Sequence, residues 1–257
     1  MSSVKGVSSR MLAPLINTQP ALLAVIMGSL MMMVLRRFKH VPTQVVKPKP
    51  LLDCIRRRRS VFPREYVRRS VPKETLHSIL EAAMWAPYHG SVPPWHFVVL
   101  GVESMVEMQR LTLEFYDRNW ERTGWADGQH GTEAEYKQWR AMTEEEITGR
   151  WGPVSYMIAI VMRRQAGSKR LPEWEEIAAT ACAVQNMHLQ STCYDGLACY
   201  WSSWHAAAMD SSEMRDFLKV SSEDRILGFF VVAACRPGQK DRRLRRKVSH
   251  LSMEVRE

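Results

Sequence analysis

The sequence predicts an α+β fold. Four uninterrupted apolar stretches have the length and the β-branched and aromatic content of buried strands. Between them lie longer segments in which apolar residues recur every three or four positions, as they do on one face of a helix. Helices and strands therefore alternate along the chain, and no internal repeat interrupts them.

The strands are expected at 96–102, 155–162, 197–204 and 226–238. Helices are expected at 71–86, 104–120, 172–196 and 211–220, with a short one at 51–60. In the first of the long helices the apolar residues Leu76, Ile79, Leu80, Ala83 and Met84 trace one face, and Pro72 stands at an early helical position. Gly196 is expected to stop the helix that begins at 172.

The composition fits one globular domain with an added N-terminal segment. The 257 residues are 46% hydrophobic and 25% charged. Five cysteines without CxxC spacing argue against a disulfide scaffold and a structural zinc site, and favour a reducing compartment. Seven of the 36 lysines and arginines precede Asp53, the first acidic residue, which leaves 29 basic against 27 acidic residues from there on. Despite the net charge of +9, the nearly neutral body argues against nucleic-acid binding.

Residues 1–50 are expected to lie outside the catalytic domain, which occupies 51–257. Residues 21–35 are uncharged and apolar, and a basic cluster follows at once. As a helix this run spans about 22 Å, less than the ~30 Å hydrocarbon core of a bilayer. A signal anchor through residues 20–38, with the catalytic domain on the cytosolic side, competes with a targeting presequence for mitochondria or another organelle. A cleaved secretory signal and a buried core helix are the further alternatives.

Residues 178–183 are six consecutive small residues, Ala-Ala-Thr-Ala-Cys-Ala, in the middle of a predicted helix. So little side-chain bulk allows another helix to approach closely. That second helix belongs either to the same core or to another subunit.

Residues 56–60 place four arginines and a serine beside a helix end. Guanidinium groups match phosphate oxygens in bidentate fashion, and a hydroxyl adds a short hydrogen bond. The run therefore suits a phosphate site, but a basic run by itself is more often a solvated face. A solvated face, or a membrane-surface patch beside the anchor, would have the same composition.

Four ordered segments resemble the FMN-dependent nitroreductase family, most closely its small bacterial branch. They are RRRRSVFPREY from 56, AAMWAPYHGSVPPWHFVVL from 82, WEEIAATACAVQNMHLQSTCYDGLACYWSSW from 174, and ILGFFVVAACRPG from 226. The resemblance covers roughly residues 51–257. It implies a three-layer αβα fold with a central mixed, largely antiparallel sheet flanked by helices. It also implies FMN as cofactor, NAD(P)H as electron donor and a homodimer.

The resemblance also assigns site residues by position. The FMN phosphate and ribityl chain would be bound by Arg58, Arg59 and Ser60. Polar contacts across the dimer interface would come from His89 and Ser91. The strand segment along the flavin would consist of Trp201, Ser202 and Ser203. An arginine of the C-terminal segment, Arg246 or next Arg243, would reach the phosphate. Trp85 stands where that branch carries a flavin-contacting arginine, and Pro93 where many relatives carry glutamine.

The chemistry that the resemblance implies is a two-step cycle. Hydride passes to flavin N5, the nicotinamide leaves, and a small-molecule acceptor takes the electrons from the same face. Nitroaromatics or quinones are the acceptors it suggests, and the cycle needs neither a catalytic side chain nor a metal. In the loop, Pro93 and Pro94 are expected to stiffen a turn that holds Trp95 as a core anchor.

Residues 121–150 are strongly polar and are expected to form an excursion that shapes the acceptor site, with Trp125, Tyr136 and Trp139. A second hypothesis is reductive dehalogenation on the same fold, for which Glu135, Tyr136 and Lys137 would bind a zwitterion. A third is a non-catalytic, membrane-tethered flavin-binding module.

Overall fold

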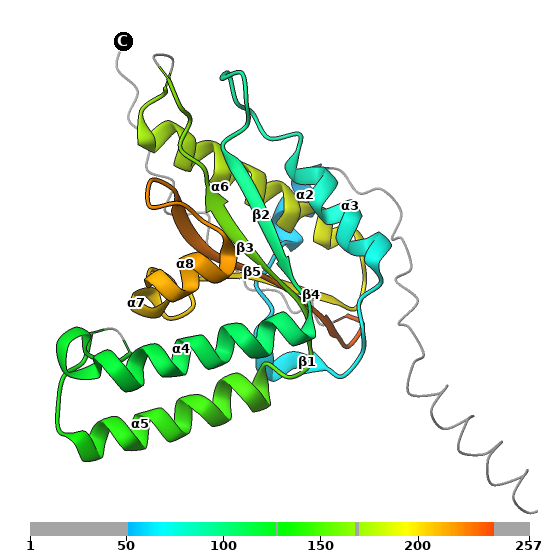
Figure 1. Ribbon diagram of the computed structural model, residues 1–257. Coiled ribbons are helices and arrows are strands. Elements are labelled where there is room, and N and C mark those ends of the chain that lie inside the picture. Colours follow the sequence, from blue (N-terminus) through cyan, green and yellow to red (C-terminus); the bar gives the residue numbers. More distant parts are fainter. Residues whose placement is uncertain (1–50, 127, 168–169, 239–257) are drawn as a thin grey trace, which may run out of the picture. The chain divides into compact units, whose positions relative to one another are not determined.

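The computed structural model describes residues 51–126, 128–167 and 170–238 (Figure 1). The predicted anchor or targeting segment, and with it the predicted localisation, lies outside the described residues, as do Arg243 and Arg246. Within the described ranges, every helix is too short or too polar to traverse a bilayer.

A five-stranded sheet forms the middle layer. Its strands are β1 (Tyr66–Val67), β2 (Trp95–Leu100), β3 (Val154–Met162), β4 (Leu197–Ser202) and β5 (Arg225–Cys235). β4 and β3 pair with β5, and β2 pairs with β3, so β4 and β2 lie at opposite edges. The short β1 pairs with the C-terminal end of β5. Every pairing between the described strands is antiparallel, so the expected mixed character of the sheet is not found among them.

Helices cover both faces of this sheet (Figure 1). They are α2 (Leu51–Arg57), α3 (Lys73–Ala83), α4 (Val102–Thr123), α5 (Glu133–Glu145), α6 (Glu173–Gln190), α7 (Ala206–Met209) and α8 (Ser212–Leu218). α3 and α6 pack on the face that carries Ile158 and Ile160. α4 and α8 pack on the face that carries Met157 and Ala159. This alternation buries both faces of β3 and confirms the three-layer α+β prediction.

The predicted helices differ from the observed ones mainly at their C-terminal ends. Met84, expected on the buried face of α3, is the C-cap residue and is 60% exposed. α6 ends at Gln190 instead of continuing to Gly196, and a short 3₁₀ turn, η3 (Ser191–Cys193), follows. The hydroxyl of Ser191 donates to the His188 carbonyl at 2.7 Å, and such local bonds compete with the helical ladder.

The small residues of α6 serve internal packing on one face. Ala179 and Ala183 are buried in one apolar cluster with Leu76 and Ile79 of α3. Their small side chains let the two helices approach closely, so the same-core alternative is confirmed for this face. Cys182, on another face of α6, is exposed in the single chain.

Candidate active site

The Arg58–Ser60 triplet lies beside the edge strand β4. After α2 ends at Arg57, the chain runs along β4, and the Val61 amide donates to the Cys199 carbonyl at 3.3 Å. Trp201, Ser202 and Ser203 follow Cys199 within four residues on the same strand and the turn after it. The structure therefore brings together two predicted flavin-contacting segments that are far apart in the sequence.

Arg58 is held by a histidine that the sequence reasoning missed. His188 Nδ1 lies 3.4 Å from Arg58 Nη1, and His188 Nε2 lies 3.2 Å from the Arg59 carbonyl oxygen. A guanidinium only donates and a carbonyl only accepts, so both contacts are hydrogen bonds in the tautomer that carries its proton on Nε2. The ring is 6% exposed and packs edge-on against Phe230 at 5.5 Å between centroids. His188 thus connects the triplet to α6 and to the sheet.

Arg59 has a different environment from Arg58. Its Nη2 lies 3.0 and 3.2 Å from the two carboxylate oxygens of Glu65, in the 3₁₀ turn η1 (Pro63–Glu65). The two side chains are only 15% and 10% exposed. Arg59 therefore anchors the turn after the triplet through a largely buried ion pair.

The strand end at Trp201 is built around Gly228. The Trp201 indole N–H donates to the Leu227 carbonyl at 2.7 Å, and the residue remains 37% exposed. Gly228 has φ +115°, and a Cβ there would overlap the Ser202 carbonyl oxygen and lie 2.8 Å from Trp201 Nε1. Ser202 is buried and accepts from the Trp204 amide at 3.1 Å, whereas Ser203 is exposed.

The loop that carries Trp85, His89 and Ser91 connects α3 to β2, at the sheet edge opposite β4. All three side chains are exposed, Trp85 by 80%, and His89 Nε2 lies 3.5 Å from a carboxylate oxygen of Glu175. A single chain does not bring this loop to the triplet. Trp95, 8% exposed, is part of the core between α3 and α6, which confirms its expected anchoring role.

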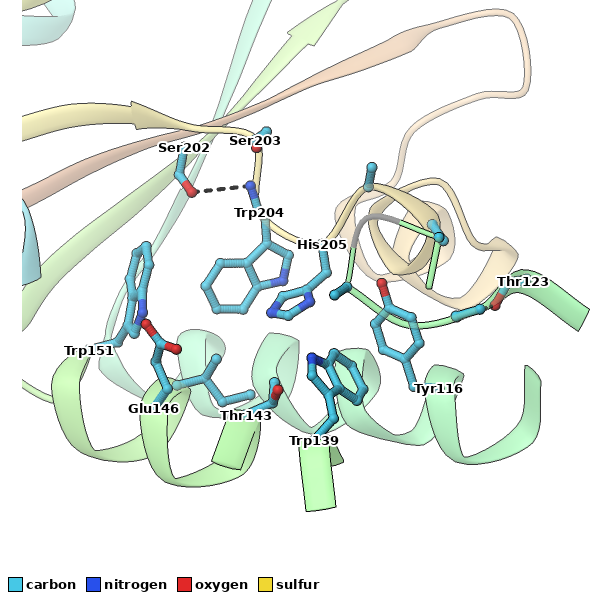
Figure 2. A pocket seen from close by; sticks show the side chains of 16 residues that line it. Tyr116, Thr123, Trp139, Thr143, Glu146, Trp151, Ser202, Ser203, Trp204 and His205 are labelled. Carbon is cyan, nitrogen blue, oxygen red and sulfur yellow. Dashed lines mark hydrogen bonds between the residues drawn. The ribbon is translucent and has the colours of Figure 1, made fainter. Parts of the chain in front are cut away.

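A pocket of about 590 Å³ opens between the end of β4 and the 121–150 excursion (Figure 2). Its walls are mainly aromatic and small polar residues: Tyr116, Trp139, Thr143, Trp151, Ser202, Ser203, Trp204 and His205, with Glu146 as an acidic member. The volume is in the range of small-molecule sites. Only Trp139, Ser202 and Ser203 were expected at a site from the sequence. Trp151 and Trp204 come together only through the fold, at 5.0 Å between ring centroids.

The negative charge of the Glu146 carboxylate acts on Tyr200, near the end of β4. Burial raises the pKa of Tyr200 on β4, a hydrogen bond with Ser202 opposes the shift, and the negative charge of Glu146 adds to it. Tyr200 therefore remains a neutral phenol at physiological pH. Figure 2 shows Glu146 next to Trp151 at one side of the pocket.

The excursion packs two buried aromatic residues against α4. Trp125 and Tyr136 are buried with Phe115 and Tyr116, and Tyr136 stacks on Trp120 with ring centroids 4.9 Å apart. Trp125 and Tyr136 are therefore structural residues, and of the three aromatics expected to shape the acceptor site, only Trp139 lines the pocket.

The residues considered for a zwitterion site each have another partner. The Glu135 side chain accepts from the Thr132 amide at 2.8 Å and completes a capping box for α5. The Tyr136 hydroxyl donates to Asp117 at 2.6 Å, and Lys137 Nζ lies 2.6 Å from Glu133. Because each side chain is engaged with another partner, nothing in this arrangement favours the dehalogenase alternative.

Comparisons with known proteins agree with this fold. A Haemophilus influenzae protein whose name includes "NAD(P)H nitroreductase" is 23% identical over 161 residues, 62% of this chain and 75% of that protein. The structure of a nitroreductase-like family protein from Bacillus cereus superposes with a TM-score of 0.60 at 22% identity, covering 82% of this chain and 98% of that chain. A Bacteroides fragilis nitroreductase with bound FMN gives a TM-score of 0.53 at 22% identity, covering 82% and 100%.

The sequence model of the Nitroreductase family matches residues 55–234, which is well over half of the chain. The match contains the arginine–serine triplet, the Ala-Pro loop and the strand that ends at Ser202. This chain therefore belongs to the nitroreductase family.

Proposed function

We propose that the chain is an FMN-dependent oxidoreductase that passes electrons from NAD(P)H to a nitroaromatic or quinone-like small molecule. Family membership, the FMN bound to the Bacteroides fragilis protein and the name of the Haemophilus influenzae relative support it. The observation that carries the proposal is the bond from the Val61 amide to the Cys199 carbonyl. It holds the cationic triplet beside the strand end that would lie along the flavin ring.

The side chains present at this site fit FMN. Arg58, aimed by His188, and the Ser60 hydroxyl would hold the phosphate, because charge-assisted hydrogen bonds to phosphate are the strong ones. The half-exposed Trp201 indole and the exposed Ser203 would border the ring. When bound, FMN supplies the two-electron chemistry, while the chain binds, orients and shields it. With a quinone, one turnover converts NAD(P)H, a proton and the quinone into NAD(P)⁺ and the hydroquinone.

The position of the Ala-Pro loop favours a homodimer. β4 and β2 are opposite edges of one sheet, and the loop with His89 and Ser91 leads into β2. The loop of one chain would therefore complete the flavin site of a second copy. A two-fold arrangement would then give two equivalent sites.

The proposal is tested on the full-length chain by titrating FMN and following the quenching of flavin fluorescence. We expect Arg58→Met to weaken FMN binding about tenfold or more, because a hydrogen bond between charged groups is lost. Arg64→Met is the matched control, since Arg64 is exposed in the adjacent turn η1, and it should bind FMN like the wild type. Equal affinities for the two variants, or no FMN binding by the wild type, would contradict the proposal.

A further inference from the structure

Irregular backbone gathers around the aromatic pocket. Among the described residues, three that are not glycine have positive φ: Ala126 at 49°, Trp204 at 53° and Lys219 at 55°. Lys219 caps α8, but Ala126 and Trp204 both line the pocket. A π-helical turn, η2 (Glu146–Arg150), adds Glu146 and Ile147 to its wall. Strained backbone and π-helical turns are both concentrated at binding sites.

The aromatic walls are held in place by specific contacts. The Trp204 indole N–H donates to Thr112 Oγ1 at 2.9 Å, and its ring packs perpendicular to Trp151. On the other side, Trp139 packs edge-on against Tyr116 with ring centroids 4.9 Å apart. Figure 2 shows Trp204 between Trp151 and His205, with Trp139 below them. A flat ring system would therefore meet preformed aromatic surfaces on several sides.

Glu146 is the one acidic side chain of the described pocket wall, and His205 is its one basic side chain. Of the described lining residues, Glu146 is the only aspartate, glutamate, lysine or arginine. Arg150 Nη1 lies 3.4 Å from a Glu146 oxygen, but both side chains are more than half exposed, and such surface pairs are weak. Aromatic faces and a carboxylate both attract cations, and the carboxylate repels anions.

We propose that this pocket holds an aromatic electron acceptor that carries a positive charge, and that Glu146 selects for that charge. This inference rests on the proposed function, because Ser202 and Ser203 line the pocket and also belong to the strand end proposed to border the flavin. It specifies the acceptor within the broad class of nitroaromatics and quinones. It also gives the π-helical turn a role in specificity.

The test uses three para-substituted nitrobenzenes of different charge: 4-nitrobenzyltrimethylammonium, 4-nitrobenzyl alcohol and 4-nitrobenzoate. For the full-length enzyme with FMN, we expect kcat/KM to fall in that order, with at least a tenfold preference for the cation over the anion. Glu146→Gln should reduce this preference about tenfold, as expected for charges several ångströms apart near a protein surface. Glu145→Gln is the control, because Glu145 is an exposed neighbour that does not line the pocket. An unchanged preference in Glu146→Gln would overturn the inference.

A binding measurement separates this inference from the proposed function. Benzyltrimethylammonium cannot be reduced, and its dissociation constant can be measured by calorimetry without turnover. If the wild type reduces no acceptor but binds this cation more tightly than Glu146→Gln does, the proposed function is wrong and the pocket assignment stands. If the wild type reduces acceptors without charge preference and does not bind the cation, the pocket assignment is wrong and the function stands.

Discussion

The buried imidazole of His188 lies between Arg58 and the backbone of Arg59, 3.4 Å from the guanidinium of one and 3.2 Å from the carbonyl of the other. Through this contact a helix from the middle of the chain orients the first arginine of the triplet. We therefore expect His188 to act as a positioning residue for the proposed phosphate site, through Arg58.

His188→Leu should weaken FMN binding about three- to tenfold, the effect of losing one hydrogen bond that aims Arg58. Riboflavin, which has no phosphate, should bind the variant and the wild type equally. The measurement is a pair of fluorescence titrations, one with each flavin. In an Arg58→Met background the same substitution should add almost nothing to the loss of FMN affinity. An equal loss for both flavins would show that His188 acts only through general packing.

The two arginines should respond differently to substitution. Arg59→Met removes one member of a largely buried ion pair and leaves Glu65 without that partner, so we expect a loss of about 2–4 kcal/mol in the free energy of unfolding. Arg58→Met should change stability much less. Urea unfolding of both variants checks this, and similar losses for the two would contradict the separate roles given to them.

Gly228→Ala should destabilise the β4–β5 pair. At φ +115° the new Cβ is strained, and it would overlap the Ser202 carbonyl oxygen. We expect a loss of roughly 1–3 kcal/mol or more, together with displacement of Trp201. Gly149→Ala is the control, because nothing lies within 4 Å of a Cβ at that position. Thermal unfolding of the two variants gives the comparison, and equal unfolding temperatures would count against the close approach at Gly228.

The hydrogen bonds that Asp117 of α4 accepts from Tyr136 and Arg140 of α5 should stabilise the fold less in acid. Burial acts to raise the pKa of Asp117, but hydrogen bonds from Arg140 and Tyr136 outweigh it and lower the pKa below its ordinary value. The stabilisation is therefore present above the unfolded-state pKa of about 4 and is lost as pH falls through the lower folded-state value. Asp117 is 43% exposed, so the effect should be below about 1 kcal/mol. Asp117→Asn should show a flatter dependence of unfolding free energy on pH between 5 and 2.

Mixing two defective variants tests the shared site. An Arg58→Met chain keeps an intact loop, and a chain with His89→Ala and Ser91→Ala keeps an intact triplet. If the loop of one subunit completes the site of another, mixed dimers should contain one intact site and regain FMN-dependent NAD(P)H oxidation. Light scattering would verify the dimer, and a monomer or a mixture without regained activity would contradict this part of the proposal.

Local patterns predicted most of the helices and strands, though not α5 or β1, and they did not predict the meeting of distant side chains. The spacing of Leu76, Ile79 and Ala83 was sufficient to place α3, because helix periodicity is a local property. The end of α6 was misplaced, because the hydroxyl of Ser191 closes a tighter turn before Gly196 is reached.

From the sequence, only those parts of the site that carry family motifs could be predicted. The family resemblance identified the triplet and the Trp-Ser-Ser strand end, but it gave no reason to single out His188, whose role depends on a tertiary contact with Arg58. The aromatic pocket was missed for the same reason. Trp151 and Trp204 belong to different elements, and only the packing of the sheet against α4 and η2 brings their rings together.

The most direct test of the account is the visible absorbance spectrum of the full-length chain saturated with FMN, recorded before and after adding NADPH without air. We predict one flavin per chain, with an oxidised flavin spectrum that is bleached by NADPH and restored when a quinone is added. A folded chain that binds no FMN, or a bound flavin that NADPH leaves oxidised, would contradict the account.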